Sequence, residues 1–175
     1  DDFGVFGNDH LLPDRLDLYA MAEAGRVLRG RVKLASLVRV LPLLVSDDGE
    51  LDVVLELGKD DDGTHTVCGT VSGRLLMQCQ RCLESMEYPL GASFRLGLVF
   101  SQEAAGDLSD RYEPLLVTRE PTEIADVISD EVLLALPIVP MHGEQAQCQA
   151  LVNEYAPAAD ERENPFAVLA QLKQK

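Results

Sequence analysis

The sequence predicts an α+β domain in which a curled antiparallel β-sheet, shaped as a partial barrel or sandwich, is packed by a main helix and a C-terminal helix. Three observations predict this class. Apolar and polar residues alternate in several segments between residues 28 and 100, turns rich in Asp and Gly separate these segments, and one clear helical stripe follows them. With 175 residues, 46 % of them hydrophobic, the chain can bury a core of this kind.

Changes in pattern divide the chain into three parts. We expect an N-terminal arm and short helix over residues 1–25, the α+β core over 26–140, and an acidic connector with the C-terminal helix over 141–175. The richest apolar run, from Val132 to Met141, is interrupted by prolines and is too short to cross a membrane.

The short N-terminal helix is expected to begin at Pro13, a residue suited to the first helical position, and to end at Gly25. Asp14 and Asp17 would then lie near its start, where acidic side chains favour the helix dipole. From Leu28 to Val40 the period becomes two, which predicts the first strand. Its odd positions carry the basic residues Arg29, Arg31, Lys33 and Arg39. Because alternate side chains of a strand project to opposite faces, one face would be positive.

Asp-Gly turns separate the strands that follow. Turns are expected at 47–49 and 60–63, with strands at 53–57, 66–78, 93–100 and 115–117. Gly69 and Gly73 are expected to form bulges. In the strand at 93–100, one side is apolar: Phe94, Leu96, Leu98 and Phe100.

The main helix is expected over 122–136, with Thr122 as its cap and Pro137 after its end. Its apolar stripe consists of Ile124, Val127, Ile128, Val132 and Ala135. The adjacent acids Asp130 and Glu131 are expected on its solvated face. A last helix would begin at Asn164-Pro165, with Phe166, Leu169 and Leu172 facing inward.

Cys79 and Cys82, in a Cys-Gln-Arg-Cys segment, form the sharpest local motif. Two thiolates at this spacing can bind one tetrahedral metal ion, usually zinc. Two further ligands would come from His142 and Cys148 or, as a second choice, from His65 and Cys68. The alternative is that the thiols only pack a turn. We therefore expect no cofactor, and zinc is the one metal that the motif leaves open. Thiol redox chemistry is disfavoured, because the pair lies between strands rather than at the start of a helix.

The chain carries 15 Lys and Arg against 30 Asp and Glu, a formal net charge of −15, yet no acid occurs between Arg26 and Ser46. The candidates for RNA contact are Arg29, Arg31, Lys33, Arg39, Arg74 and Arg81. With 5 % aromatic residues and no Trp, such a surface would contact phosphates rather than bases. The acidic segments 46–65 and 103–163 would bind a basic protein, keep RNA away from the wrong face of the molecule, or only keep the chain in solution.

Four short segments occur in one order along the chain. They are Cys79 to Cys82 after a strand, Tyr112-Glu113-Pro114, the run from Asp130 to Pro140 followed by His142, and the run from Asn164 to Ala170 with Leu172-Lys173. Together they resemble the YceD family, the bacterial large ribosomal RNA subunit accumulation proteins. The resemblance covers the chain from about residue 75 to its end.

The resemblance implies a non-enzymatic factor that supports accumulation or maturation of large-subunit ribosomal RNA. Its partners would be that RNA or the pre-ribosomal particle, together with a basic ribosomal or assembly protein. No membrane partner is expected. The sequence agrees with a non-enzymatic role, since no phosphate loop, nucleophile elbow or dinucleotide fingerprint occurs. Four cysteines make no disulfide framework, which favours a cytoplasmic location. The alternatives are a protein-only adaptor that binds through the 124–136 helix or the last helix, and a zinc- or thiol-dependent protein that uses the CxxC.

Overall fold

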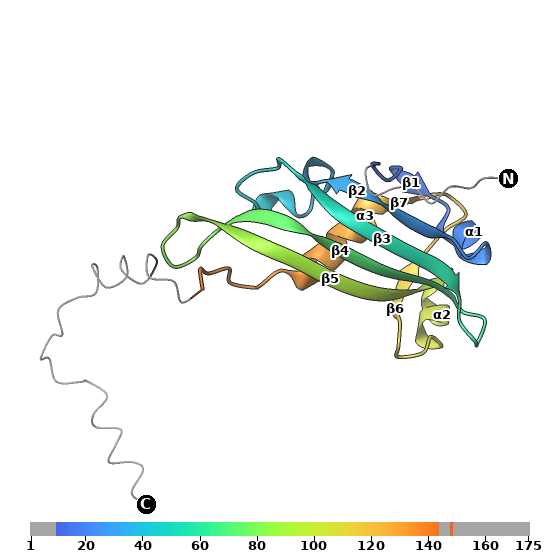
Figure 1. The fold of residues 1–175 in the computed structure, drawn as a ribbon. Helices are drawn as coiled ribbons and strands as arrows, with labels where there is room; N and C mark the ends of the chain where they lie inside the picture. The colour runs from blue at the N-terminus through green and yellow to red at the C-terminus, as the bar shows by residue number, and fades with distance from the viewer. Residues whose placement is uncertain (1–9, 144–147, 149–175) are drawn as a thin grey trace, which may run out of the picture. The chain divides into compact units, whose positions relative to one another are not determined.

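A five-stranded sheet makes up most of the structure, a computed structural model that describes residues 10–143 and Cys148 (Figure 1). In spatial order its strands are β2 (Val27–Lys33), β3 (Glu50–Lys59), β4 (His65–Gln78), β5 (Ser85–Val99) and β6 (Glu113–Leu116). The first four pair antiparallel, whereas β6 runs parallel to β5. The predicted α+β class is confirmed. The sheet is mixed and open rather than antiparallel throughout, and its described strands do not close into a barrel.

The helix α3 (Ile124–Ala135) lies against one face of this sheet and completes the core (Figure 1). Its Ile124, Ile128 and Val132 side chains are at most 2 % exposed. The predicted helix is therefore confirmed, but Thr122–Glu123 precede it as the short strand β7 and Thr122 is not its cap.

The first helix, α1 (Leu18–Glu23), begins later than Pro13. Arg15–Leu16 form the strand β1, which pairs antiparallel with β7, so the backbone is extended where a helix was expected. Asp17 caps α1, because its Oδ1 accepts a hydrogen bond from the N–H of Ala20 at 2.9 Å. The prediction that the helix begins at Pro13 is thus wrong, although Asp17, which was expected near its start, is its cap.

The first predicted strand is correct only as far as Lys33. Beyond it the chain forms two 3₁₀ turns, η1 (Leu34–Ser36) and η2 (Leu41–Leu43). Three buried side chains mark the new spacing: Leu34, Leu37 and Val40. Val38 is 71 % exposed, although a strand of period two would bury it. Because three-residue spacing is that of a 3₁₀ turn, Arg39 does not belong to the basic strand.

The strands β4 and β5 are longer and more regular than expected. β5 begins at Ser85 rather than at Ser93, and its register with β4 is continuous, so Gly69 and Gly73 form no bulges. Gly69 instead makes room for Phe94, its partner across the strands. A Cβ atom at position 69 would lie 2.1 Å from Phe94 Cζ. The glycine is therefore needed for packing and not for a change of register.

The remaining connections are short. The turn predicted at 60–63 is present, with Gly63 at a φ of +83°. The polar connector after β5 contains a helix of five residues, α2 (Gln102–Gly106), capped by the hydroxyl of Ser101. The strand expected at 115–117 is β6.

Contacts divide the chain into two units, Asp1–Met141 and His142–Lys175. The first unit holds both sheets and the described helices. The helix predicted from Asn164 and the arm at 1–9 lie outside the described residues. Among the residues that are described, no helix is both long enough and apolar enough to span a bilayer.

Candidate functional site

Three basic side chains alternate along β2. Arg29, Arg31 and Lys33 project to the outer face of the sheet, away from α3, and are exposed or half-buried. The residues between them point inward and are buried: Leu28, Gly30 and Val32. This part of the prediction is confirmed, because the observed period is two.

The neighbouring strand β3 places carboxylates beside these cations. Asp52 and Glu50 are the register partners of Arg31 and Lys33, and Glu50 Oε2 lies 2.8 Å from Arg31 Nη1. Within the described part of the chain, Arg29 and Lys33 form no ion pair. The outer face therefore carries mixed charge rather than the uniformly positive surface predicted from one strand, since cross-strand neighbours share each face.

The other predicted RNA-contact residues lie apart from β2. Arg39 forms an ion pair with Asp130 of α3, and Arg74 on β4 pairs with Glu87 across the strands at 3.4 Å. Arg81 lies in the turn between β4 and β5. The structure thus brings three of the six residues together on β2 and leaves the others at separate places. Their role in RNA contact stays a prediction.

A groove with a volume of about 760 Å³ is lined by residues of β3, β4 and β5, by the loop before β6, and by α3. Its acidic lining consists of Glu56, Asp110, Glu113 and Glu131, against the basic residues Arg95 and Arg111. Four carboxyl groups against two guanidinium groups make the groove a negative surface. Protonation of one carboxylate would reduce this negative charge. Such a surface suits the cationic side chains of a partner.

Glu131 is the groove residue whose place the sequence prediction missed. Expected on the solvated face of α3, it is 9 % exposed. Burial, with the negative charges of Glu113 and Asp130, raises the pKa of Glu131 to about 7. Its spacing carries the missed signal: Glu131 lies two helical turns after Ile124 and about one turn after Ile128, on the buried stripe.

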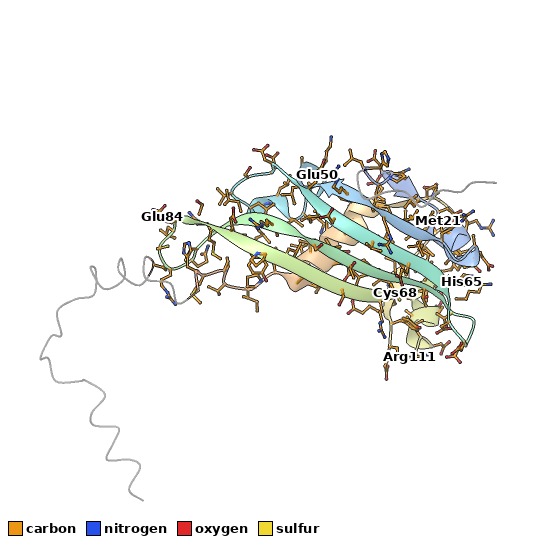
Figure 2. The ribbon with its side chains drawn as sticks, in the orientation of Figure 1. Met21, Glu50, His65, Cys68, Glu84 and Arg111 are labelled. Atoms are coloured by element: carbon orange, nitrogen blue, oxygen red, sulfur yellow. The ribbon has the colours of Figure 1, made fainter. Side chains whose placement is uncertain are left out.

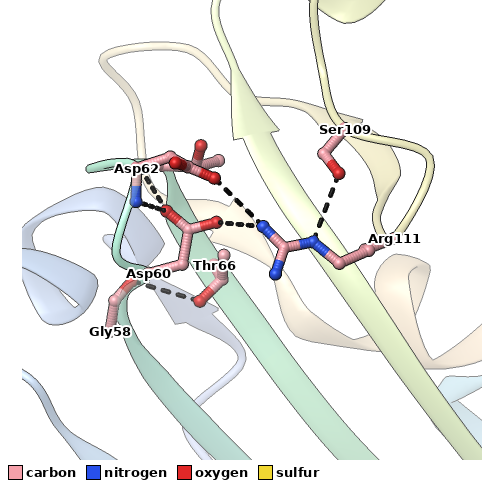
Figure 3. Close-up of polar contacts among 7 residues, drawn as sticks. Gly58, Asp60, Asp62, Thr66, Ser109 and Arg111 are labelled. Atoms are coloured by element: carbon pink, nitrogen blue, oxygen red, sulfur yellow. Dashed lines mark hydrogen bonds and ion pairs between the residues drawn. The ribbon is translucent and has the colours of Figure 1, made fainter.

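Arg111 joins the loop before β6 to the turn between β3 and β4 (Figure 3). Its Nη2 lies 3.1 Å from Asp62 Oδ2 and 3.6 Å from Asp60 Oδ2. Its Nε donates to Ser109 Oγ at 3.2 Å. These contacts fix the loop that carries Tyr112 along one side of the groove.

The same cluster shifts two pKa values in opposite directions. Burial and then the hydrogen bond with Asp60 raise the pKa of Tyr112 above its ordinary value. Burial would also raise the pKa of Asp60, but hydrogen bonds from Thr64, Tyr112 and Asp62, with the charge of Arg111, hold it below its usual value. Near neutral pH the carboxylate is therefore ionised and the phenol neutral. This pair stabilises the loop and is not poised for proton transfer.

The turn between β4 and β5 presents the CxxC motif and is closed by backbone hydrogen bonds. The N–H of Cys79 donates to Glu84 O, and the N–H of Leu83 donates to Cys79 O, both at 2.9 Å. The N–H of Arg81 donates to Cys79 Sγ at 3.4 Å. Cys79 is 0 % exposed. We call residues 79–84 the cysteine turn.

The segment after α3 reaches the cysteine turn. The N–H of Gln80 donates to Pro140 O at 2.8 Å, and Arg81 Nη2 lies 3.8 Å from Met141 Sδ. His142 is the next residue along the chain. One ligand atom from each of four residues lies within 4.8 Å of the other three: Cys79, Cys82, His142 and Cys148.

The second choice of metal ligands does not join this group. His65 and Cys68 lie at the end of the sheet opposite to Glu84 (Figure 2). At about 3.3 Å per residue, Cys68 is roughly 36 Å along the strand from Cys79. His65 instead lies 2.7 Å from Glu23 Oε1 and stacks on Tyr19.

Comparison with known proteins matches the part of the chain that contains the cysteine turn, the groove loop and α3. The family model described as large ribosomal RNA subunit accumulation protein YceD matches residues 67–173. The chain belongs to the YceD family. A relative from Haemophilus influenzae, named large ribosomal RNA subunit accumulation protein YceD, is 32 % identical over 144 residues, 79 % of this chain and 83 % of that protein. No solved structure matches the chain significantly.

The YceD match covers β4 to α3 and continues to residue 173, so it includes the groove loop and all four residues of the cysteine and histidine group. Strand β2, with Arg29, Arg31 and Lys33, precedes it. The family description names an accumulation protein and no catalytic activity.

Proposed function

We propose that this chain is a non-enzymatic assembly factor that supports accumulation of large-subunit ribosomal RNA. Membership of the YceD family carries the proposal, because the family description and the name of the Haemophilus influenzae relative both refer to that accumulation. The charged surfaces support action by binding: a strand of exposed cations and an acidic groove lie on the same sheet.

Contact with RNA would occur at phosphates along β2. Alternate residues of a strand lie about 6.6–6.8 Å apart, so neighbouring cations can meet successive phosphates. Arg29 and Lys33 are exposed, and the partly exposed pair between Arg31 and Glu50 is weak enough for a phosphate to replace the carboxylate. This contact would be independent of base sequence.

A second mode of binding is favoured by the groove. Its four carboxyl groups would accept Lys and Arg side chains of a basic ribosomal or assembly protein. The apolar stripe of α3 is less suited to such a role, because Ile124, Val127 and Val132 are already buried in the core. A protein-only adaptor would therefore use the groove rather than that stripe.

A deletion strain tests the cellular function. We expect less large-subunit RNA relative to small-subunit RNA, and restoration of the ratio by the plasmid-borne chain. Sucrose-gradient sedimentation should also place part of the protein in pre-ribosomal fractions. An unchanged RNA ratio in the deletion strain, with the protein confined to the top of the gradient, would refute the proposal.

Charge reversal tests the RNA contact on β2. We expect the triple variant Arg29→Glu, Arg31→Glu, Lys33→Glu to bind large-subunit RNA more weakly, with a salt dependence smaller by up to about three phosphate contacts. The matched control is Arg119→Glu, an exposed change in the loop after β6. Equal binding by the triple variant and the control would exclude β2 as the RNA contact.

The groove is tested by Glu113→Lys, which places a cation in its lining. In a pull-down after nuclease treatment, we expect this variant to lose a basic partner that the wild-type chain retains. Glu120→Lys is the control, because Glu120 is exposed and does not line the groove. Partner loss in both variants, or in neither, would count against the groove.

A further inference from the structure

We propose that Cys79, Cys82, His142 and Cys148 bind one zinc ion in a closed structural site. This inference is independent of RNA binding and of the role in accumulation. It rests on the conformation of the cysteine turn, on the contacts that bring the segment after α3 to that turn, and on the proximity of four ligand atoms.

The cysteine turn is shaped as a metal-binding turn before any ion is considered. The N–H of Arg81 points at the sulfur of Cys79, and a hydrogen bond of this kind stabilises negative charge on a ligating thiolate. Leu83 follows with a φ of +64°, a backbone conformation that costs a leucine energy. A turn built for packing alone would place Gly or Asn here, so we infer that the position of the two sulfurs outweighs the strain.

Chain connectivity supplies the third ligand. Because Gln80 holds Pro140 by a backbone hydrogen bond and Arg81 contacts Met141, His142 must follow close to the cysteine turn. Cys148 lies six residues later, a length that spans at most about 20 Å and so reaches back without difficulty. The pair His142 and Cys148 thus complements the pair Cys79 and Cys82.

The distances fit a tetrahedral site. With Zn–S bonds of about 2.3 Å and Zn–N bonds of about 2.0–2.1 Å, ligand atoms of a tetrahedron lie roughly 3.5–3.8 Å apart. The four ligand atoms here lie within 4.8 Å of one another, so shifts of about an ångström complete the site. Cys79 and Cys148 are buried, which limits access of water to the ion.

The donor set selects zinc and a structural role. Three thiolates and one imidazole are soft and borderline ligands, which disfavour magnesium and calcium. Four protein ligands leave no open coordination position for a substrate or a water molecule, as catalytic zinc requires. The assembled centre would carry one negative charge, because three thiolates meet one divalent ion.

Zinc content of the full chain, purified in reductant without chelator, tests the proposal. We expect about one zinc ion per wild-type chain and at least a tenfold loss in Cys79→Ser and in Cys148→Ser. Cys68→Ser is the matched control, since Cys68 is a cysteine of β4 that lies outside the group, and this variant should retain the zinc. Circular dichroism shows which variants are folded.

Cobalt substitution of the wild-type chain tests the same ligands without any mutation. We expect an intense sulfur-to-cobalt absorption of a size that indicates three thiolates, together with the visible bands of tetrahedral cobalt. A folded wild-type chain with four titratable thiols, no zinc and no such bands would overturn the proposal. Equal zinc loss in Cys68→Ser would overturn the assignment of these four ligands.

Discussion

The two ends of the sheet are closed by different chemistry. At one end, the turn between β3 and β4 is stabilised by carboxylates: Asp60 accepts the N–H groups of Asp62 and Thr64 at 3.0 and 2.8 Å, and Arg111 from the loop before β6 neutralises it. At the other end, the cysteine turn is closed by backbone hydrogen bonds and brings together sulfur atoms instead of charged pairs. We call the first the carboxylate end.

The left-handed residues of the two turns show what this difference means. Gly63 takes a φ of +83° at the carboxylate end, where a glycine accepts it without steric strain. Leu83 takes +64° in the cysteine turn, although its side chain is 64 % exposed and gains little by packing. The turn between β3 and β4 thus has the residue that suits its backbone. The strain at Leu83 in the cysteine turn agrees with the proposal that the two sulfurs are held by a bound ion.

Metal removal should give the largest change in stability, and it should act on the cysteine turn only. We expect a strong zinc chelator to lower the melting temperature by roughly 10 °C, equivalent to about 3 kcal/mol for a chain of this size. Hydrogen exchange should show loss of protection at Cys79 and Leu83, whose N–H groups close the cysteine turn, and none at Gly63. Equal loss at both ends would mean that the chelator unfolds the sheet as a whole, and the contrast between the ends would fail.

Replacement of Glu131, which lines the groove and belongs to neither turn, should give the next largest effect on stability. Because its folded pKa of about 7 exceeds the ordinary 4.5, its contribution to stability is complete below about pH 4.5 and is lost as pH rises through 7. Glu131→Gln removes this dependence. We expect urea denaturation to show the variant more stable than wild type by on the order of 2 kcal/mol at pH 8, and by about half as much at pH 5.5.

The exposed change Glu120→Gln serves as the control for Glu131→Gln. This change should leave the free energy of unfolding unaffected at both pH values, because surface carboxylates contribute little to stability. A Glu131→Gln variant that is less stable than wild type at pH 8 would show that the ionised carboxylate makes a favourable contact in the groove.

Local patterns in the sequence predicted the elements whose partners lie nearby in the chain. The turn at 60–63, the strand at 66–78 and the helix before Pro137 all follow from turn residues and periodicity, and all are present. The grouping of Cys79 with His142 also followed from motif spacing, and the structure brings both close together.

Features that depend on distant partners were not predictable from local patterns. The parallel pairing of β6 with β5 is set by packing, and the carboxylates of Glu50 and Asp52 beside β2 appear only once the register with β3 is known. Glu131 differs, because its spacing from Ile124 already placed it on the buried stripe. For Glu131, the expectation that acidic residues face solvent was followed instead of the helical spacing of the buried residues.

Gly63→Ala tests the carboxylate end at its left-handed residue. We expect a loss of about 1–2 kcal/mol in the free energy of unfolding, because a Cβ atom at positive φ is strained although no neighbour lies within 4 Å of it. Gly91→Ala is the matched control: Gly91 is exposed, lies in β5 and has equally open surroundings without a positive φ. Equal destabilisation by both changes would show that backbone strain is not the cause.

Leu83→Gly makes the opposite change in the cysteine turn and should have the smallest effect. Glycine relieves the left-handed strain of about 1–2 kcal/mol but restores backbone entropy to the unfolded chain, which costs about 0.5–1 kcal/mol. The net expectation for the zinc-loaded protein is a gain of about 0.5 kcal/mol, or 1–2 °C in melting temperature. Leu83→Ala removes the same side chain but keeps the Cβ atom, so it should bring no gain. Should both variants be equally less stable than wild type, the exposed leucine would be contributing packing, and the strain at Leu83 would no longer distinguish the cysteine turn from the carboxylate end.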